Sequence, residues 1–408
     1  MGTVRIAIVS FPGSNGEVES MRVIRRVGME PVFFRWNDDR ATLKDIDGYF
    51  IPGGFSYEDR GRSGMVAARD PLMDTIGAEA DAGKVVIGIC NGAQVLVESG
   101  LVPSGDGLRM SLARNAIQTE RGMETLPLLS EWVWMTRSCA KDRCATSGWD
   151  EVMQVPIAHG EGRFTTLDTE LIEELQENDQ IAFSYSDAGG TVRDDPTTTP
   201  NGSVLAIAGI CNPAGNVVAL MPHPERAQGG GDAYFASMRE WIERRRRTAA
   251  PSEKRRKKSG RMPGFRTLPI HAAKGVEIFI ETIITNNEER TVEQAARRVA
   301  PALRLKQWKY LSVQVSAVEQ VLADLTVFNA NKERAFIKKG SEGAQFIGRR
   351  TVLIRRDIPD AGSSLCGEGT QTGTAYGIEG ISEQEMCSEK LLEVFANPHA
   401  GTLERITV

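Results

Sequence analysis

The chain has 408 residues, 41% of them hydrophobic, and a formal net charge of −5 at pH 7. This length exceeds one typical domain, and this hydrophobic content can bury a full core, which excludes a disordered chain. No apolar run approaches the roughly 18 residues of a membrane span, and the N-terminal residues lack the features of a secretion signal, so we expect a cytoplasmic protein that binds no membrane.

Strands and helices are predicted to alternate through the first 220 residues. Such alternation predicts parallel strands with crossover helices, and hence an α/β fold with a mostly parallel sheet flanked by helices. Functional loops should then gather at the carboxyl ends of the strands. The expected strands are 4–10, 31–34, 49–51 and 85–89, and amphipathic helices are expected near 17–28 and 70–83.

The loop after the strand at 49–51 is rich in glycine. Pro52, Gly53 and Gly54 tolerate unusual φ/ψ angles and present bare N–H groups, which an oxyanion hole requires. An ordinary strand-to-loop turn is the alternative, and we would favour it in the absence of a nucleophile and a base.

A cysteine follows the strand at 85–89, in Gly88-Ile89-Cys90-Asn91-Gly92. A strand, a glycine-flanked turn and a short helix form the thiol counterpart of the nucleophile elbow, which leaves the central side chain exposed. The N–H groups and the dipole at the helix N-terminus favour a thiolate, which is the reactive species. Cys90 is therefore a candidate nucleophile, and a buried structural cysteine is the alternative.

A candidate base lies further along the chain, where an apolar strand at 217–221 runs into Pro222-His223-Pro224-Glu225. A cysteine nucleophile needs an imidazole that takes and returns a proton, and the imidazole needs a third group that fixes its tautomer. Cys90, His223 and Glu225 are therefore predicted to form a catalytic triad.

These motifs together resemble the class I glutamine amidotransferases. Within that class, five ordered segments are similar to the glutaminase subunits of phosphoribosylformylglycinamidine synthases, and the similarity covers roughly residues 3 to 246. The five segments are 11–15, 51–57, 90–92, 158–162 and 221–226. The resemblance implies hydrolysis of L-glutamine to glutamate and ammonia.

The resemblance also implies roles for residues around the triad. In amidotransferases one oxyanion-hole donor comes from a glycine loop and the other from the residue after the nucleophile, which here are the backbones of Gly54 and Asn91. Gly53, Gln94 and His159 are the expected substrate-binding residues. A nonfunctional role remains the alternative for two of these: Gln94 could be a glutamine on a helix surface, and the segment around His159 could be a solvent-exposed loop.

The family implies a partner, a large synthetase subunit that uses ATP and magnesium to amidate formylglycinamide ribonucleotide. Nothing in this sequence resembles a P-loop, so the ATP and Mg are expected on the partner, and no cofactor is expected on this chain. Cys139 and Cys144 lack zinc-ligand spacing with a second pair, so we expect no metal site. The stretch around 132–149 fits the family poorly, and Glu58 stands where the family usually has Gly.

A basic stretch from 247 to 267 is predicted to be a linker after a first domain at 1–246. Arginines at 244–247 and the basic run 254–258 invite a nucleic-acid interpretation. The stretch has no interleaved aromatic residues and belongs to an acidic chain, so we expect a solvated linker and no nucleic-acid partner.

Residues 268–408 are predicted to form a second, α+β domain. Strands are expected at 276–285, 310–315, 320–328, 351–355 and 403–408. Capping boxes at 291–294 and 382–385 predict two helices. Two β-α-β halves of this kind indicate a ferredoxin-like module.

The end of this domain, from Met386 through 396–398, is similar to the end of the small subunit of the same synthase. If residues 268–408 are this small subunit, its fusion to the glutaminase domain would raise the effective concentration of a bridging subunit. The alternative is that residues 268–408 are an unrelated α+β interaction domain. For the whole chain, two other functions stay open: a glutaminase of another pathway, and a noncatalytic assembly or nucleic-acid-binding protein.

Overall fold

The computed structural model of the chain describes residues 2–105, 107–120, 122–150, 152–248, 265, 268–340, 342–362, 367 and 369–406. The chain divides into two compact units, Met1–Met262 and Pro263–Val408. Most of the predicted linker, together with Cys366, lies outside the described residues. Within the described residues, no helix is both long enough and apolar enough to span a membrane.

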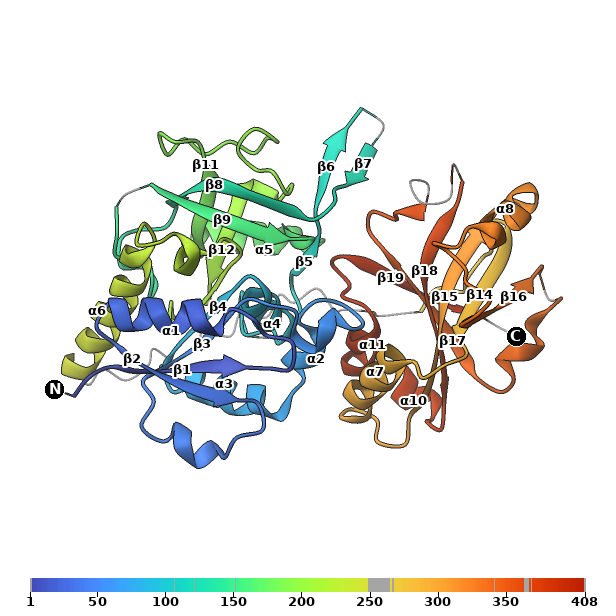
Figure 1. The fold of residues 1–408 in the computed structure, drawn as a ribbon, viewed down its shortest axis with the longest axis horizontal. Helices are drawn as coiled ribbons and strands as arrows, with labels where there is room; N and C mark the ends of the chain where they lie inside the picture. The colour runs from blue at the N-terminus through green and yellow to red at the C-terminus, as the bar shows by residue number, and fades with distance from the viewer. Residues whose placement is uncertain are drawn as a thin grey trace. The chain divides into compact units, whose positions relative to one another are not determined.

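The first unit is built on a nine-stranded sheet (Figure 1) with the strand order β2-β1-β3-β4-β13-β12-β11-β8-β9. The sheet has a parallel half, in which all neighbours from β2 to β13 in this order run parallel, and an antiparallel half, in which all neighbours from β13 to β9 run antiparallel. The strands are β1 (Arg5–Ser10), β2 (Glu30–Arg35), β3 (Gly48–Ile51), β4 (Val85–Ile89), β8 (Leu129–Arg137), β9 (Met153–His159), β11 (Ile181–Ser186), β12 (Ile207–Cys211) and β13 (Val217–Leu220).

Helices pack against the parallel half of this sheet. Helix α4 contacts β4 and β13, α3 contacts β4, and α1 contacts β1, β2 and α6. The helices are α1 (Glu17–Arg26), α2 (Met65–Ala68), α3 (Pro71–Asp81), α4 (Asn91–Glu98), α5 (Thr169–Glu177) and α6 (Asp232–Thr248), and two small antiparallel sheets pair β5 (Ser111–Arg114) with β10 (Glu161–Thr165) and β6 (Ala116–Thr119) with β7 (Gly122–Thr125).

The prediction of an α/β fold is confirmed, but the sheet is mixed rather than mostly parallel. The expected alternation of strands and helices stops after α4. Among the described residues from β5 to β12 there is one α-helix, α5. Antiparallel neighbours need no crossover helix and can be joined by short loops. The connection from β12 to β13, residues 212–216, is such a loop.

The topology brings three loops to one edge of the sheet. Strands β3, β4 and β13 are consecutive neighbours and run in the same direction. Their carboxyl ends therefore meet at one edge, and Gly53, Cys90 and His223 each lie within three residues of such an end.

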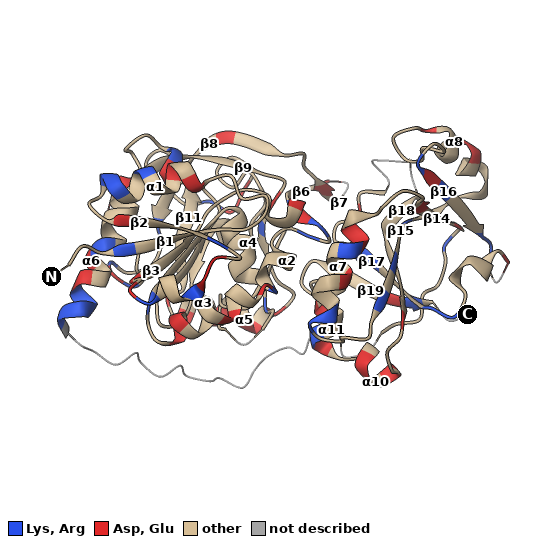
Figure 2. Ribbon diagram, turned by 60° about the horizontal axis from the view of Figure 1, so that its bottom comes forward, with Lys and Arg blue, Asp and Glu red and all other residues tan. Residues whose placement is uncertain are grey.

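Figure 2 shows the end of α6 in blue, where its arginines lie, and three of these arginines make contacts within the first unit. Arg244 pairs with Asp142 at 3.1 Å, and Arg246 pairs with Asp47 at 2.6 Å. The guanidinium of Arg245 lies 5.2 Å from the ring centroid of Trp241. These three arginines are thus engaged in contacts within the first unit.

The second unit contains a six-stranded antiparallel sheet with the order β16-β14-β15-β18-β17-β19. Both faces of the sheet are apolar: Phe279, Trp308 and Tyr310 belong to one buried cluster, and Ile278 and Leu311 belong to another. The elements are β14 (Val276–Thr282), α7 (Asn287–Arg297), β15 (Arg304–Val313), α8 (Val318–Ala323), β16 (Glu333–Lys338), β17 (Thr351–Asp357), β18 (Gln371–Glu379), α10 (Glu383–Met386), α11 (Glu389–Phe395) and β19 (Gly401–Ile406).

This second, sheet-rich unit is α+β, as predicted, but its topology is not ferredoxin-like. Strands β14 and β15, which α7 connects, are direct antiparallel neighbours, whereas a split β-α-β unit places another strand between them. The prediction missed β16 and β18, and β18 contains Gly373 and Gly377, which weaken the sequence signal of a strand.

Two local predictions in this unit were also wrong. Helix α7 begins four residues before Thr291, and its cap is Asn286, whose side chain accepts a hydrogen bond from the N–H of Glu289 at 3.1 Å. The strand expected at 320–328 is not formed: residues 320–323 belong to helix α8, in which Val318, Val321 and Leu322 follow helical spacing, and a turn follows. The capping box at 382–385 is present at the start of α10.

Candidate active site

Cys90 lies in a strained turn between β4 and α4. Its φ is +52° and its ψ is −108°, in a region that residues with a side chain rarely adopt. The turn requires the two glycines that flank it: a Cβ on Gly92 would lie 1.9 Å from the carbonyl oxygen of Ile51, and a Cβ on Gly88 would lie 2.3 Å from that of Gly92. This is the local geometry of a nucleophile elbow.

His223 and Glu225 form a buried pair at the end of β13. The Nδ1 of His223 lies 2.5 Å from the Oε1 of Glu225, and their side chains are 2% and 1% exposed. Pro224 occupies the first position of a short 3₁₀ turn, Pro224–Arg226, which carries the carboxylate back toward the ring. The His223 Nε2 is buried and has no hydrogen-bond partner within the described residues.

Gly53 lies against both Cys90 and His223. A Cβ added to Gly53 would be 3.5 Å from the Cβ of Cys90 and 2.9 Å from the Cε1 of His223. The thiol and the imidazole therefore line the same small space, and only glycine leaves that space open.

The charges in this space favour a protonated His223. Burial alone would lower the pKa of His223, but the Glu225 carboxylate and the Cys90 sulfur outweigh burial and raise the pKa to about 10. The imidazole is therefore an imidazolium at neutral pH, poised to give up a proton.

Gly54 and Asn91, the two residues predicted to supply oxyanion-hole amides, directly follow Gly53 and Cys90 in the chain. Gly54 has a φ of +145°, and it faces Ser14 in an isolated bridge whose hydrogen bonds are made by Asn15 N to Gly53 O and by Phe55 N to Gly13 O. The N–H of Gly54 itself takes no part in this bridge. Asn91 is the first residue of α4, where backbone N–H groups have no partner inside the helix.

The side chain of Asn91 ties the glycine loop to helix α4. Its Oδ1 accepts a hydrogen bond from Ser56 N at 3.0 Å, and its Nδ2 donates to Gln94 Oε1 at 2.8 Å and to Asp59 Oδ1 at 3.2 Å. Gln94 Nε2 donates in turn to the backbone oxygen of Glu161 at 2.5 Å. Both ends of the Gln94 amide are thus already engaged, and Gln94 joins the site through Asn91.

Asp59 stands out within this network. Burial and the nearby charge of Glu161 together raise its pKa to about 7, against the hydrogen bonds from Ser63 and Asn91, which lower it. The carboxyl of Asp59 therefore changes its charge near neutral pH, two hydrogen bonds away from the Gln94 amide.

His159 lies close to His223 and is held neutral. Burial lowers the pKa of His159 to about 3, with a further contribution from the positive charge of His223. The Nδ1 of His159 lies 3.2 Å from Asn115 Oδ1, and Asn115 Nδ2 donates to the backbone oxygen of His159 at 2.7 Å. The residue before His159 also contacts the nucleophile, because the Cys90 Sγ lies 3.7 Å from the backbone oxygen of Ala158.

All eight residues predicted for the site lie in this one region, either at the thiol and imidazole or one contact away. Three further residues of this region, Asp59, Asn115 and Tyr185, were not predicted from the sequence. Burial and the charge of Cys90 raise the pKa of Tyr185. Asp59 lies two residues after the 51–57 motif and so had a positional signal. Asn115, between β5 and β6, and Tyr185, in β11, had none, because they reach the site only through the fold.

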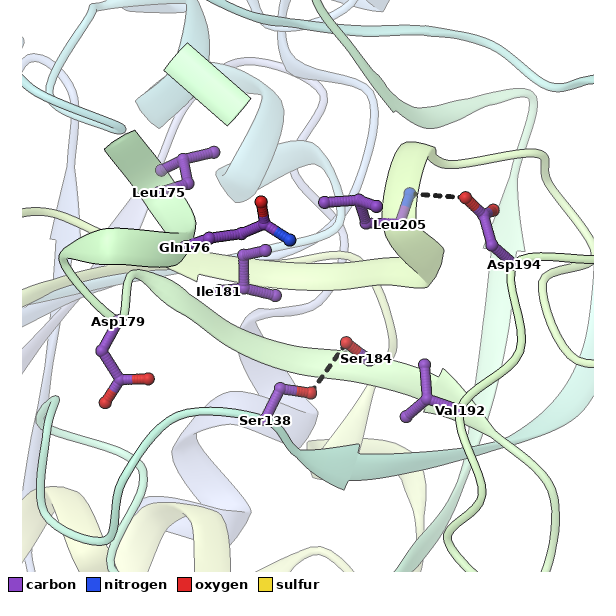
Figure 3. A pocket seen from close by; sticks show the side chains of 9 residues that line it. All are labelled: Ser138, Leu175, Gln176, Asp179, Ile181, Ser184, Val192, Asp194 and Leu205. Carbon is purple, nitrogen blue, oxygen red and sulfur yellow. Dashed lines mark hydrogen bonds between the residues drawn. The ribbon is translucent and has the colours of Figure 1, made fainter. Parts of the chain in front are cut away.

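A separate pocket of about 450 Å³ contains none of these residues (Figure 3). Ser138 and Ser184 are hydrogen-bonded at 2.7 Å on one side of this pocket, and Asp194 accepts a bond from Leu205 N on another. Within the described ranges, no group of three His, Cys, Asp or Glu side chains is arranged to hold a metal ion.

Comparisons with known proteins place the first unit in a family. Residues 3–247 match the CobB/CobQ-like glutamine amidotransferase domain. The phosphoribosylformylglycinamidine synthase subunit PurQ of Methanothrix thermoacetophila is 42% identical over 261 residues, which cover 60% of this chain and 100% of that protein. The PurQ subunit of Thermomicrobium roseum is 42% identical over 236 residues, 56% of this chain and 91% of that protein.

A solved structure of PurLQS from Thermotoga maritima has a chain that is 30% identical, with a TM-score of 0.47, over 59% of this chain and 100% of that one. The match to the family model and the likeness to whole PurQ subunits confirm the prediction made from the five motifs. The chain therefore belongs to the CobB/CobQ-like glutamine amidotransferase family, with a PurQ-like glutaminase domain in its first unit.

Proposed function

We propose that the chain is the glutaminase component of a phosphoribosylformylglycinamidine synthase, which releases ammonia from L-glutamine for purine biosynthesis. The observation that carries this proposal is the geometry around Gly53, where Cys90 in its strained turn and the buried His223–Glu225 pair border one small space. The likeness to PurQ subunits over their full length supports the choice of pathway.

In the first step the Cys90 thiolate attacks the carboxamide carbon of glutamine. The carbonyl oxygen becomes an oxyanion, and the N–H groups of Gly54 and Asn91 are proposed to stabilise it. Loss of one such donor typically costs about 10²- to 10³-fold in rate. Collapse of the intermediate requires a proton on the departing nitrogen, and the His223 imidazolium supplies it.

The second step regenerates the Cys90 thiolate and the protonated His223. After ammonia leaves, His223 is neutral and can take a proton from water, which attacks the thioester that Cys90 forms with the glutamyl group. Glutamate leaves and Cys90 returns to its initial state. Glu225 holds the His223 ring in one tautomer and supports its charge in both steps.

We propose Gly53, Gln94 and His159 as substrate-binding residues, with different contributions. Gly53 leaves room for the carboxamide between the thiol and the imidazole. His159 presents a buried Nε2 that has no partner within the described part of the chain. Gln94 would act mainly by orienting Asn91, since both ends of its amide are bonded.

The ammonia is proposed to pass to a large synthetase subunit, which binds ATP and Mg and amidates formylglycinamide ribonucleotide. On this proposal the chain itself needs no cofactor, because attack, proton transfer and oxyanion stabilisation all come from its own groups. We place these steps in the cytoplasm.

The test is release of glutamate from glutamine by the full chain together with the large subunit. Cys90→Ala should lower this rate by at least about 10³-fold, because no other group replaces the nucleophile. Cys387→Ala is the matched control, since Cys387 is exposed and lies in the second unit, and it should keep the wild-type rate. Equal rates for Cys90→Ala and wild type would refute the mechanism.

We also propose that residues 268–408 serve as the small subunit of the same synthase. The capped helix α10, helix α11 and strand β19 agree with the elements expected where the sequence is similar to that subunit. The full chain and the large subunit should then form amidated product without a separate small subunit. A strict requirement for an added small subunit would favour an unrelated interaction domain.

A glutaminase of another pathway is the remaining alternative. It would release glutamate through the same residues but would give no amidated product from formylglycinamide ribonucleotide and ATP in the reconstituted complex.

A further inference from the structure

Asn115 holds the loop that follows His159, and no step of the proposed reaction uses it. Asn115 lies between β5 and β6 and is fully buried. Its backbone N–H donates to Gly160 O at 2.9 Å, and its backbone oxygen accepts a hydrogen bond from Leu126 N at 2.7 Å. The main chain of Asn115 is thus fixed on both sides, and its side-chain amide contacts His159.

The contacts of Asn115 fix which end of its side-chain amide is the oxygen. Its Oδ1 lies 3.1 Å from Gly162 N, which can only donate, and its Nδ2 lies 2.7 Å from the backbone oxygen of His159, which can only accept. A reversed amide would place two donors together at one contact and two acceptors together at the other. The atom of Asn115 that lies 3.2 Å from His159 Nδ1 is therefore the acceptor, Oδ1.

This acceptor selects one tautomer of the His159 ring. A neutral imidazole carries one proton, either on Nδ1 or on Nε2. Because Asn115 Oδ1 cannot donate, Nδ1 carries the proton and Nε2 keeps a bare lone pair. Burial lowers the pKa of His159 to about 3, so no second proton occupies Nε2 at neutral pH.

The Nε2 of His159 is a buried acceptor that has no donor among the described residues. Buried polar groups are normally hydrogen-bonded, and an acceptor left without a donor costs free energy. The ring is also closely packed, since a Cβ on Gly162 would lie 2.3 Å from its Nδ1 and from its Cε1. A donor on a bound ligand would complete the hydrogen bonding of this ring.

The strand that carries His159 runs along the reacting groups. In β9, the backbone oxygen of Ala158 lies 3.7 Å from Cys90 Sγ, and the backbone oxygen of Pro156 accepts a hydrogen bond from His223 N at 2.9 Å. His159 is the next residue after Ala158. A carboxamide held for attack by Cys90 would thus lie beside this strand, and its nitrogen carries two N–H donors.

We propose, on the basis of the glutaminase function above, that His159 Nε2 accepts a hydrogen bond from the carboxamide nitrogen of glutamine and that Asn115 is the positioning residue that fixes this tautomer. The neutral ring orients the nitrogen, and the proton for the departing ammonia still comes from His223. The arrangement also distinguishes substrate from product. The carboxylate of glutamate has no N–H to offer, so its oxygen and the bare Nε2 would be two acceptors without a proton between them.

The first test is kcat/KM for glutamine, measured as glutamate release by the full chain with the large subunit. His159→Leu removes the acceptor and should lower kcat/KM by roughly 10- to 100-fold. Asn115→Leu should lower it by no more than that factor. The double variant should be no worse than His159→Leu, because Asn115 acts through His159. Effects that multiply in the double variant, or a wild-type kcat/KM in His159→Leu, would overturn the proposal.

Asn201→Leu is the matched control. Asn201 is also fully buried and holds the same loop by donating to Gly162 O at 2.8 Å, and none of its hydrogen bonds among the described residues reaches His159. Any loss that Asn201→Leu causes should therefore multiply with that of His159→Leu. A loss of this kind comes from the packing of the loop, and Asn115→Leu should not behave in this way.

The second test observes the tautomer itself, by ¹⁵N NMR of the full chain labelled at its four histidines. The signals of His159 are those that disappear in His159→Leu. Its Nδ1 should be protonated and its Nε2 bare at both pH 8 and pH 5, and Asn115→Leu but not Asn201→Leu should allow a proton onto Nε2. A protonated Nε2 in the wild type would overturn the proposal. This measurement needs no turnover, whereas a wild-type complex that releases no glutamate would refute the glutaminase function instead.

Discussion

At the scale of single residues, the charge on His223 decides when the proposed chemistry can run. The Glu225 carboxylate is 2.5 Å from the ring, and with Cys90 it offsets the effect of burial and raises the pKa of His223 to about 10. Because the pKa is raised on folding, the stabilisation by the proton is fully present below the unfolded value of about 6.5 and is lost as pH rises through about 10.

Glu225→Gln should therefore move the alkaline limit of activity to lower pH. In the wild type, kcat/KM for glutamine should fall as pH rises through about 10, when His223 loses its proton. Removing the carboxylate charge lowers the pKa of His223, so the falling limb should shift downward along with an overall loss of rate. The measurement is kcat/KM against pH for both proteins, and superimposable alkaline limbs would show that Glu225 does not set the charge of His223.

Asp59→Asn should stabilise the protein more at pH 8 than at pH 5. Burial and the charge of Glu161 raise the pKa of Asp59 to about 7, against about 3.9 in an unfolded chain. The folded state thus holds more protons between these values, and stability falls as pH rises through this window. Asn removes the buried charge and can still accept the hydrogen bond from Asn91. Thermal melts at the two pH values measure the difference.

Asp187→Asn is the matched control for this prediction. Backbone hydrogen bonds from Thr191 and Gly189 lower the pKa of Asp187, so its charge favours the fold. The substitution at Asp187 should give no gain at pH 8. A gain as large as that of Asp59→Asn would mean that general surface charge, and not burial of Asp59, is responsible.

The catalytic residues could be predicted from the sequence, but the charge states of the residues around them could not. Cys90, His223 and Glu225 are recognisable from residue type and from their places after strands. The charge states of Asp59 and His159 depend instead on burial and on the charges of Glu161 and His223, which come near them only in the fold. A linear sequence carries no signal for such neighbours.

At the scale of elements, the loop after Gly54 stores backbone strain. Tyr57, Glu58 and Asp59 have φ angles of +52°, +57° and +52°, three consecutive residues in the left-handed region. The loop is held by Asn91 through Ser56 N and by Tyr57 N, which donates to Pro12 O at 2.6 Å. Strain held in this way is typical of loops that form part of a functional site.

Glu58→Gly should raise the free energy of unfolding by about 1 kcal/mol, because glycine adopts a φ of +57° without a steric cost. The Glu58 side chain is 74% exposed and pairs with Arg60, and an exposed pair of this kind contributes little. Glu170→Gly, in the first turn of α5, is the control and should destabilise by up to about 1 kcal/mol. Urea unfolding of both variants checks the pair, and a Glu58→Gly variant less stable than wild type would contradict the strain argument.

Elements were predictable where local pattern and fold agree. Strands β1, β3 and β4 and helices α1 and α3 lie close to their expected bounds, since apolar runs and helical spacing mark them. Strand β18 and helix α8 were not found, because the first contains two glycines and the second is only six residues long.

At the scale of the whole molecule, the first unit explains how distant segments make one site. The parallel order β3-β4-β13 places Gly53, Cys90 and His223 at one edge. Strand β9 of the antiparallel half brings in His159, and β10, which pairs with β5 in a separate small sheet, brings in Glu161. The parallel half follows from the alternation of strands and helices in the sequence. The antiparallel half does not, because its strand pairing depends on contacts far apart along the chain.

The central claim is that Cys90 releases, from glutamine, the nitrogen that a partner subunit incorporates. The most direct measurement is amidation of formylglycinamide ribonucleotide by the reconstituted complex, with glutamine or with ammonium as the nitrogen donor, for wild type and Cys90→Ala. We predict that Cys90→Ala abolishes amidation from glutamine and retains amidation from ammonium. Amidation from glutamine at the wild-type rate in Cys90→Ala would contradict the claim.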